Sequence, residues 1–185
     1  MTRYHLVAAA LFVSVIVPSP VTANHPSLEE ACADMACRPA TDVRLKTDNG
    51  EIIAVPVASR PYVFHGLISI IPGETIYIEA VPQGGILTDL RFVPAVENPD
   101  RTMTLKLEQV AELGMVLTVS NPFSKPLKYR AGIHRLGYEE FHTTSICPVP
   151  RGLKSYEQWP EPLIHILLVD FRFIDENDQD DLACN

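Results

Sequence analysis

Cysteines are the residues with the clearest capacity for chemistry in this chain: Cys32, Cys37, Cys147 and Cys184. Thiolates can hold zinc or pair as disulfides. The C-x4-C spacing of Cys32 and Cys37 is wider than a C-x2-C zinc knuckle, and no second close pair completes a tetrahedral site. In an exported chain an even count indicates two disulfides. Three pairings are open, and we favour the local one, Cys32–Cys37 with Cys147–Cys184.

The N-terminus indicates export. Arg3 precedes an uncharged run from Leu6 to Val17, two prolines follow, and Val21-Thr22-Ala23 has the small-x-small pattern of a cleavage site. This predicts a secretory signal peptide over residues 1–23, cut after Ala23. A membrane span needs about 20 apolar residues, so the run is too short to be one. We therefore expect a periplasmic or secreted protein of residues 24–185, with no transmembrane anchor.

Histidines and serines give weaker signals. No H-E-x-x-H motif and no G-x-S-x-G elbow occurs, so no catalytic residue and no cofactor are expected. His165 lies within an apolar run and is interpreted as a structural histidine. His25 would be the second residue of the processed chain, where the terminal amine, an amide nitrogen and the imidazole can bind Cu(II). His25 is thus a weak metal candidate.

Acidic residues dominate the charge balance. The formal net charge of −8 argues against a nucleic-acid partner. The stretch Asp175–Asp181, "DENDQDD", is rich in oxygen ligands, yet Asp180 stands where an EF-hand loop requires glycine. We predict a solvated acidic tail over residues 175–185, and cation binding by this tail stays open.

One basic cluster stands out in this acidic chain. It begins in the proline-bounded stretch "SNPFSKP", which would present Phe123 and Lys125 at a corner, and continues in the outward row Lys128, Arg130 and His134. Such a surface could meet a protein, a glycan or an anionic small molecule. The alternative is an ordinary charged solvent face or a row that protects an edge strand.

Strand-like segments account for nearly all of the remaining chain. Only Ser27–Ala36 has a helical pattern, with Ser27 as cap and Glu30 completing a capping box. About ten short apolar or alternating runs follow, separated by turn residues such as Asn49-Gly50 and Gly84-Gly85. Met103, Leu105 and Leu107 alternate with polar residues, as in a half-buried strand. The run Leu163–Phe173 is apolar on both faces at first, which indicates a central strand.

These runs predict an all-β, antiparallel β-sandwich in a single domain over residues 24–185, with a short N-terminal helix of one or two turns in a helical or loop segment at 24–40. The segment "LTVSNPFSKPLKYRAGI" resembles the hairpins of immunoglobulin-like sandwiches in exported proteins. The resemblance covers about twenty residues and implies an architecture, not a function.

The functional expectation is therefore broad. We expect a disulfide-stabilised, exported protein that is a non-enzymatic binding or envelope-associated accessory module acting through its loops. Two alternatives remain: a secreted hydrolase whose loop-borne active site has no recognisable motif, or a periplasmic metal-handling protein. A pocket in which a histidine meets a hydroxyl or carboxylate would favour the hydrolase.

Overall fold

The computed structural model describes residues 28–175 and 182–184 of the chain. The predicted signal peptide with its cleavage after Ala23, the candidate His25, the cap Ser27 and most of the acidic tail lie outside the described residues. The elements are α1 (Leu28–Ala31), β1 (Cys37–Arg38), β2 (Thr41–Lys46), β3 (Ile52–Val57), β4 (Arg60–Pro61), β5 (Val63–Phe64), β6 (Leu67–Ile70), β7 (Thr75–Gln83), β8 (Ile86–Val93), β9 (Thr102–Val110), β10 (Gly114–Ser120), β11 (Leu127–Arg135), β12 (Phe141–Thr144), β13 (Lys154–Trp159) and β14 (Leu163–Phe173).

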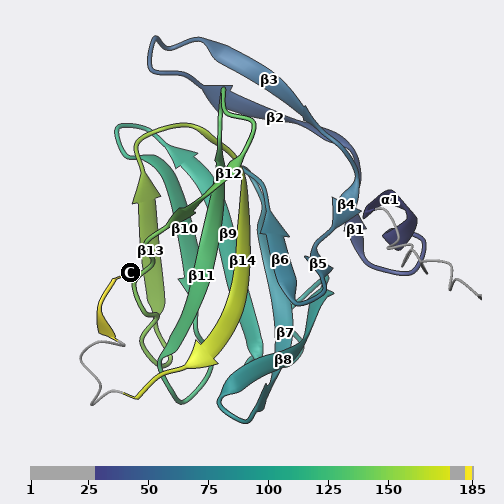
Figure 1. The fold of residues 1–185 in the computed structure, drawn as a ribbon, viewed down its shortest axis with the longest axis vertical. Coiled ribbons are helices and arrows are strands. Elements are labelled where there is room, and N and C mark those ends of the chain that lie inside the picture. The colour runs from purple at the N-terminus through teal and green to yellow at the C-terminus, as the bar shows by residue number, and fades with distance from the viewer. Residues whose placement is uncertain (1–27, 176–181, 185) are drawn as a thin grey trace, which may run out of the picture.

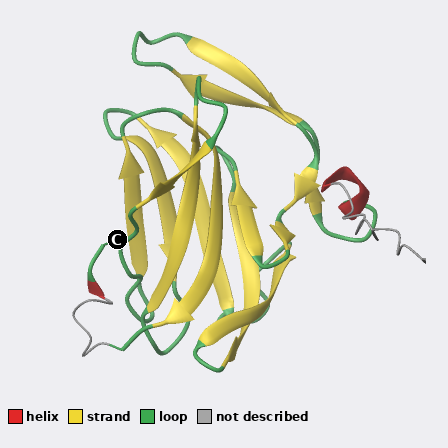
Figure 2. Cartoon of the chain, in the orientation of Figure 1, coloured by secondary structure: helices red, strands yellow, loops and turns green. Residues whose placement is uncertain are grey.

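The described secondary structure is nearly all antiparallel β-strand, which confirms the predicted all-β class (Figure 2). Within the helical pattern Ser27–Ala36, only α1 (Leu28–Ala31), a single turn, is helical among the described residues. The nearby disulfide explains the early end. Five residues of α-helix rise about 7.5 Å, whereas the Cα atoms of Cys32 and Cys37 lie 5.5 Å apart.

Ten of the described strands form one hydrogen-bonded sheet in the order β12-β11-β14-β8-β7-β9-β10-β13, with β6 beside β14 and β5 beside β6. The sheet curves back on itself, so that β11 and β14 pass in front of β9 and β10 (Figure 1). Its two halves meet where β14 pairs with β8 at Arg172 and Ile86. The immunoglobulin-like arrangement stays a prediction.

The apolar rows that the sequence predicted form the core. In β9 the side chains of Met103, Leu105 and Leu107 are fully buried. Strand β14 lies between β11 on one side and β6 and β8 on the other, as its two apolar rows predicted. Burial of such apolar rows supplies the main free energy of folding.

The β2–β3 hairpin projects beyond the main sheet at the top of Figure 1. Its two strands pair only with each other among the described strands. The Gln109 side chain of β9 joins it to the sheet: Lys46 N donates to Gln109 Oε1 at 2.8 Å, and Gln109 Nε2 donates to Lys46 O at 2.6 Å. The Gln109 amide thus makes with Lys46 the two hydrogen bonds that the backbone of a neighbouring strand would otherwise make.

Strand β13 was not expected from the sequence. Its inward residues are Ser155, Glu157 and Trp159, so its buried row is mostly polar and shows no apolar alternation. It packs closely against the β9–β10 turn. A Cβ atom on Gly114 would lie 2.3 Å from Trp159 O, so this position admits only glycine.

Candidate functional site

A solvent-open groove lies at the end of the sheet where the β7–β8 turn, the β10–β11 corner and the end of β14 meet. It has two lobes. Lobe A encloses about 590 Å³ and lobe B about 470 Å³. Gly85, Ser124, Lys125 and Phe173 line both lobes, so the two form one continuous groove. Such volumes fall in the range of small-molecule sites.

The corner between β10 and β11 is held by one buried side chain, Asn121. Its Nδ2 donates to Lys125 O at 2.8 Å and to Val149 O at 3.0 Å, while its Oδ1 accepts from Phe123 N at 2.9 Å. A buried amide with its donors and acceptor satisfied fixes the loop geometry. Asn121 is a positioning residue that the sequence analysis did not single out. Its place between a strand and Pro122 is the signal that could have found it.

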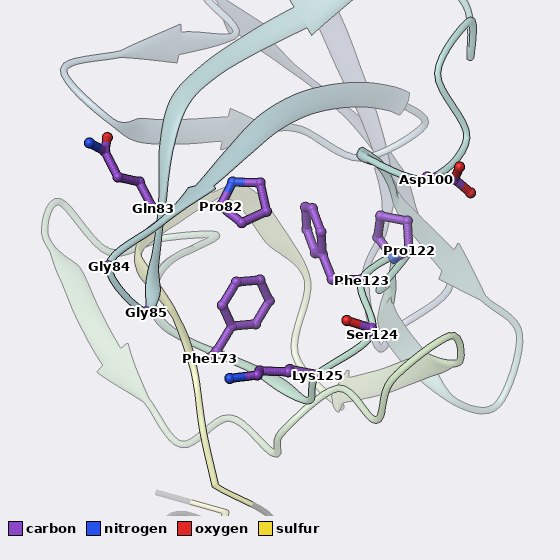
Figure 3. Close-up of a pocket in the computed structure, with 10 residues that line it drawn as sticks. All are labelled: Pro82, Gln83, Gly84, Gly85, Asp100, Pro122, Phe123, Ser124, Lys125 and Phe173. Carbon is purple, nitrogen blue, oxygen red and sulfur yellow. The ribbon is translucent and has the colours of Figure 1, made fainter.

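Aromatic and proline rings form the floor of lobe A. Phe123 and Phe173 meet edge to face with ring centroids 5.4 Å apart, and the rings of Pro82 and Pro122 stand beside them (Figure 3). Phe173 is half-buried and Pro82 is exposed, so apolar surface faces the groove. Phe123 itself is only 6% exposed. The expectation that Phe123 is presented at the tip is therefore wrong, because its ring turns inward against Phe173.

The β7–β8 turn forms the opposite wall. Gln83 pairs with Ile86, which leaves Gly84 and Gly85 as a two-residue turn with φ of 60° and 89°. Both angles lie in the left-handed region that such a hairpin requires. Phe173 N donates to Gly85 O at 2.8 Å and so ties this wall to β14.

Charged groups lie at the rim. Lys125 and Asp100 are both exposed and line lobe A, and they extend from different parts of the rim in Figure 3. Within the described ranges neither side chain has an ion-pair partner. Lobe B adds Arg151 and Asp175. The groove therefore combines an apolar floor with polar groups directed to solvent.

The rest of the predicted basic row does not join this site. Lys128 is buried rather than outward, and its Nζ donates to Ala183 O at 3.1 Å, because the C-terminal segment covers it. Arg130 is exposed, but its guanidinium donates to the carboxylate of Asp170. Of the cations in the predicted surface, only Lys125 lines the groove.

His134 also has local partners. Its Nε2 lies 2.7 Å from Tyr138 O, and a carbonyl only accepts, so this nitrogen donates. Its ring lies 5.1 Å from the ring of Phe141. His134 thus stabilises the β11–β12 hairpin, away from Lys125.

A serine and a histidine do come together elsewhere in the fold. Ser69 Oγ lies 2.6 Å from His165 Nε2, and both residues are buried. On the other side of the ring, Nδ1 lies 3.2 Å from Arg60 Nη1. Arginine can only donate, so Nδ1 accepts and the proton of the neutral ring resides on Nε2.

This tautomer is the opposite of the one that activates a nucleophile. A general base needs a lone pair on the nitrogen that faces the hydroxyl, whereas here Nε2–H donates to Ser69. Burial, reinforced by Arg60 and Arg38, lowers the pKa of His165 to about 3, so the ring is neutral at physiological pH. Neither Ser69 nor His165 lines the groove. The pair is a structural histidine contact.

Arg38 completes this buried network. Its Nε donates to Glu74 Oε1 at 2.7 Å, its Nη1 to Ser69 Oγ at 2.7 Å and its Nη2 to Ser69 O at 2.6 Å. Arg38 belongs to β1, so these bonds fasten the N-terminal segment to β6. We call the buried Arg38, Ser69 and His165, with the half-buried Arg60 and Glu74, the buried network.

The four cysteines form two disulfides, Cys32–Cys37 and Cys147–Cys184. This is the local pairing preferred in the sequence analysis. The second disulfide holds the C-terminal end against the strand β13 region, where Glu157 Oε1 accepts from Cys147 N at 2.8 Å.

Among the described residues, no group of three or more His, Cys, Asp or Glu side chains is arranged to hold a metal ion. The metal candidate His25 and tail residues 176–181 lie outside those residues. The described part of the chain also contains no helix with the length and hydropathy of a membrane span.

The groove, rather than any catalytic constellation, is thus the candidate site. Comparison with known proteins adds no relative: no family model, no curated protein and no solved structure matches this chain.

Proposed function

We propose that this chain is an exported, non-enzymatic binding module that takes its ligand in the groove between the β7–β8 turn and the β10–β11 corner. One observation carries the proposal. An apolar floor of phenylalanine and proline rings opens to solvent beside Lys125, which has no ion-pair partner among the described residues. Apolar sites with a few placed polar groups are the usual form of a ligand pocket.

Hydrogen bonds hold both walls of the groove, which favours binding without rearrangement. Asn121 fixes one wall through its hydrogen bonds, and the Gly84–Gly85 turn is tied to Phe173. Preorganised walls reduce the ordering free energy that a ligand must offset. The ligand class that suits Lys125 is an anionic group on a protein, a glycan or a small molecule.

Export and architecture belong to the same proposal. The predicted signal peptide and two disulfides support a periplasmic or secreted protein. The curved antiparallel sheet supports a sandwich of immunoglobulin-like type that carries its binding loops at one end.

An NMR titration tests the proposal. Neutral p-cresol, added to the purified 15N-labelled protein, should shift the amide signals of Gly84, Gly85, Ser124 and Lys125 more than others. Ser124 is exposed and lines both lobes, so Ser124→Trp should fill the groove and abolish these shifts. Thr41→Trp, at an exposed position on β2, is the matched control. Shifts that scatter over the surface, or that persist in Ser124→Trp, would contradict the groove as a site.

The two alternatives have direct tests. If Ser69 were a nucleophile, Ser69→Ala would remove hydrolysis of an activated ester; we expect the background rate to stay unchanged. A thermal shift with Cu(II), Zn(II) or Ca(II) would favour metal handling.

A further inference from the structure

The ligand class of the groove follows from the way its two lobes meet. Lobe A is lined by the rings of Pro82, Pro122, Phe123 and Phe173. An aromatic ligand ring fits such a floor, because aromatic rings prefer edge-to-face and offset contacts with other rings. Gly84 and Gly85 leave the wall open: a Cβ atom on either would meet nothing within 4 Å.

Lys125 stands where the lobes join. It lines both of them, it is exposed, and no described residue pairs with its ammonium group. A carboxylate at this junction would gain a charge-assisted hydrogen bond and would displace no ion pair formed by the described residues.

Lobe B leads away from the junction and is lined by polar as well as apolar residues. Ser124, Arg151 and Asp175 stand beside Pro126 and Ile174. Peptide groups, which carry both a donor and an acceptor, suit such a mixed lining.

At the junction of the groove, therefore, the apolar lobe A, the Lys125 ammonium group and the polar lobe B meet. The terminal residue of a peptide has the same three substituents at its Cα atom, namely a side chain, a carboxylate and a main chain. A fatty acid or an aryl acid has only two of these groups. Capture of a C-terminal carboxylate is an established mode of peptide recognition.

We infer that the groove binds the C-terminus of a peptide that ends in an aromatic residue, with the ring in lobe A, the carboxylate at Lys125 and the preceding peptide group in lobe B. This inference rests on the proposed function. It adds the ligand's chemistry and its orientation.

Calorimetric and NMR titrations with three probes test it. The probes are the dipeptide Ala-Phe, its C-terminal amide, and 3-phenylpropionate, which has ring and carboxylate but no main chain. Ala-Phe should bind about tenfold more tightly than its amide, the factor expected for one charge-assisted hydrogen bond. It should also bind more tightly than 3-phenylpropionate.

Lys125→Ser should lower the affinity for Ala-Phe by about the same tenfold factor and leave the affinity for the amide unchanged. Lys154→Ser, which removes an exposed lysine from β13, is the matched control and should change neither. Because Lys125 is exposed, its replacement should not prevent folding.

The outcomes separate the two proposals. If Ala-Phe and its amide bind equally in the groove, or if 3-phenylpropionate binds as well as Ala-Phe, the C-terminal inference is overturned and the groove remains a binding site. If p-cresol and all three probes leave the signals of the groove unmoved, both proposals fail.

Discussion

The buried network around Arg38 and the groove around Lys125 both place cations beside aromatic or apolar groups, yet they have opposite consequences. Arg38 is 1% exposed and its donors are taken up by Glu74 and Ser69. Lys125 is exposed and unpaired among the described residues. A cation with its partners inside the fold stabilises the fold, and a cation without them is available to a ligand.

The two regions also show that residue type alone does not identify a functional site. Ser69 and His165 are the residue types of a hydrolase, but the network consumes their hydrogen-bonding capacity. Phe123 and Pro122 carry no catalytic group, yet together with Lys125 they border space that solvent can enter. Access and unsatisfied polar capacity therefore identify a site better than residue types do.

The largest expected effect comes from opening the network. Arg38→Gln removes the hydrogen bonds of a buried guanidinium to Ser69 and to the half-buried Glu74 carboxylate, and should lower the unfolding free energy by about 3 kcal/mol. Lys125→Gln should change it by less than about 0.5 kcal/mol. Urea denaturation of both variants measures the contrast. Equal losses of unfolding free energy in the two variants would contradict the view that Arg38 stabilises the fold and Lys125 does not.

The corner of the groove gives the next largest effect. Asn121→Ala removes the bonds to Lys125 O, Val149 O and Phe123 N. Unsatisfied buried groups lower stability by about 1–3 kcal/mol, and the loosened wall should also weaken p-cresol binding. Ser124→Ala, on the exposed side of the corner, is the control and should keep the wild-type midpoint. An Asn121→Ala variant with unchanged binding would show that the corner does not position the site.

Lowering the pH should reduce the stability contributed by the buried network, and Lys125 in the groove should have no part in this loss. The lowered pKa of His165 means that the unfolded chain takes up a proton below about pH 6.5 while the folded chain does not. Stability from His165 is thus complete above pH 6.5 and is lost as the pH falls toward 3. Thermal melts between pH 7.5 and 5.5 should show a falling midpoint that is flatter in His165→Gln. Lys125→Ser should keep the wild-type slope.

Two carboxyl groups have opposing effects, and both are present in the wild type and in His165→Gln, so the comparison of the two slopes isolates His165. Hydrogen bonds from Arg91 and Asn98 lower the pKa of Glu79, whose stabilising effect is lost at pH values below about 4.5. Burial raises the pKa of Glu157, so the contribution of Glu157 to the unfolding free energy increases as the pH falls through this raised pKa. A wild-type slope identical to that of His165→Gln would contradict the role given to His165.

The smallest effect on stability is expected at Arg130, the exposed arginine of the predicted basic row. Arg130 and Asp170 form an exposed ion pair, and exposed pairs contribute roughly 0–1 kcal/mol. Arg130→Ser should therefore lower the unfolding free energy by less than about 1 kcal/mol and leave Ala-Phe binding unchanged. Chemical denaturation and calorimetry measure the two quantities. A loss of binding would extend the site beyond the groove.

The sequence predicted the strands well where apolar alternation marks a buried row. Met103, Leu105 and Leu107 are such a row, and Leu163–Phe173 is the central strand its composition indicated. Strand β13 escaped prediction because Ser155 and Glu157 occupy its buried row. The local pattern of apolar and polar residues predicts a buried row only where that row is apolar. Whether polar residues such as Ser155 and Glu157 are buried depends on partners distant in sequence.

The candidate site was predicted only in part. The proline-bounded corner and Lys125 were identified from sequence, but alternation alone placed Lys128 outward, and the C-terminal segment that covers it is 55 residues away. Phe173 and the Gly84–Gly85 turn reach the groove through tertiary contacts. No local pattern contains those contacts, so the groove could be recognised only in three dimensions.

The attachment of the β2–β3 hairpin through Gln109 has a consequence for local dynamics. The hairpin is joined to β9 by one side-chain amide and by the packing of residues such as Val43 and Leu45, with no backbone ladder between them. Such a unit can open without unfolding the sheet, because few cooperative bonds connect the two. Its amide protons should exchange with solvent together, and earlier than those of β9 and β10, as one cooperative subunit of the folded state.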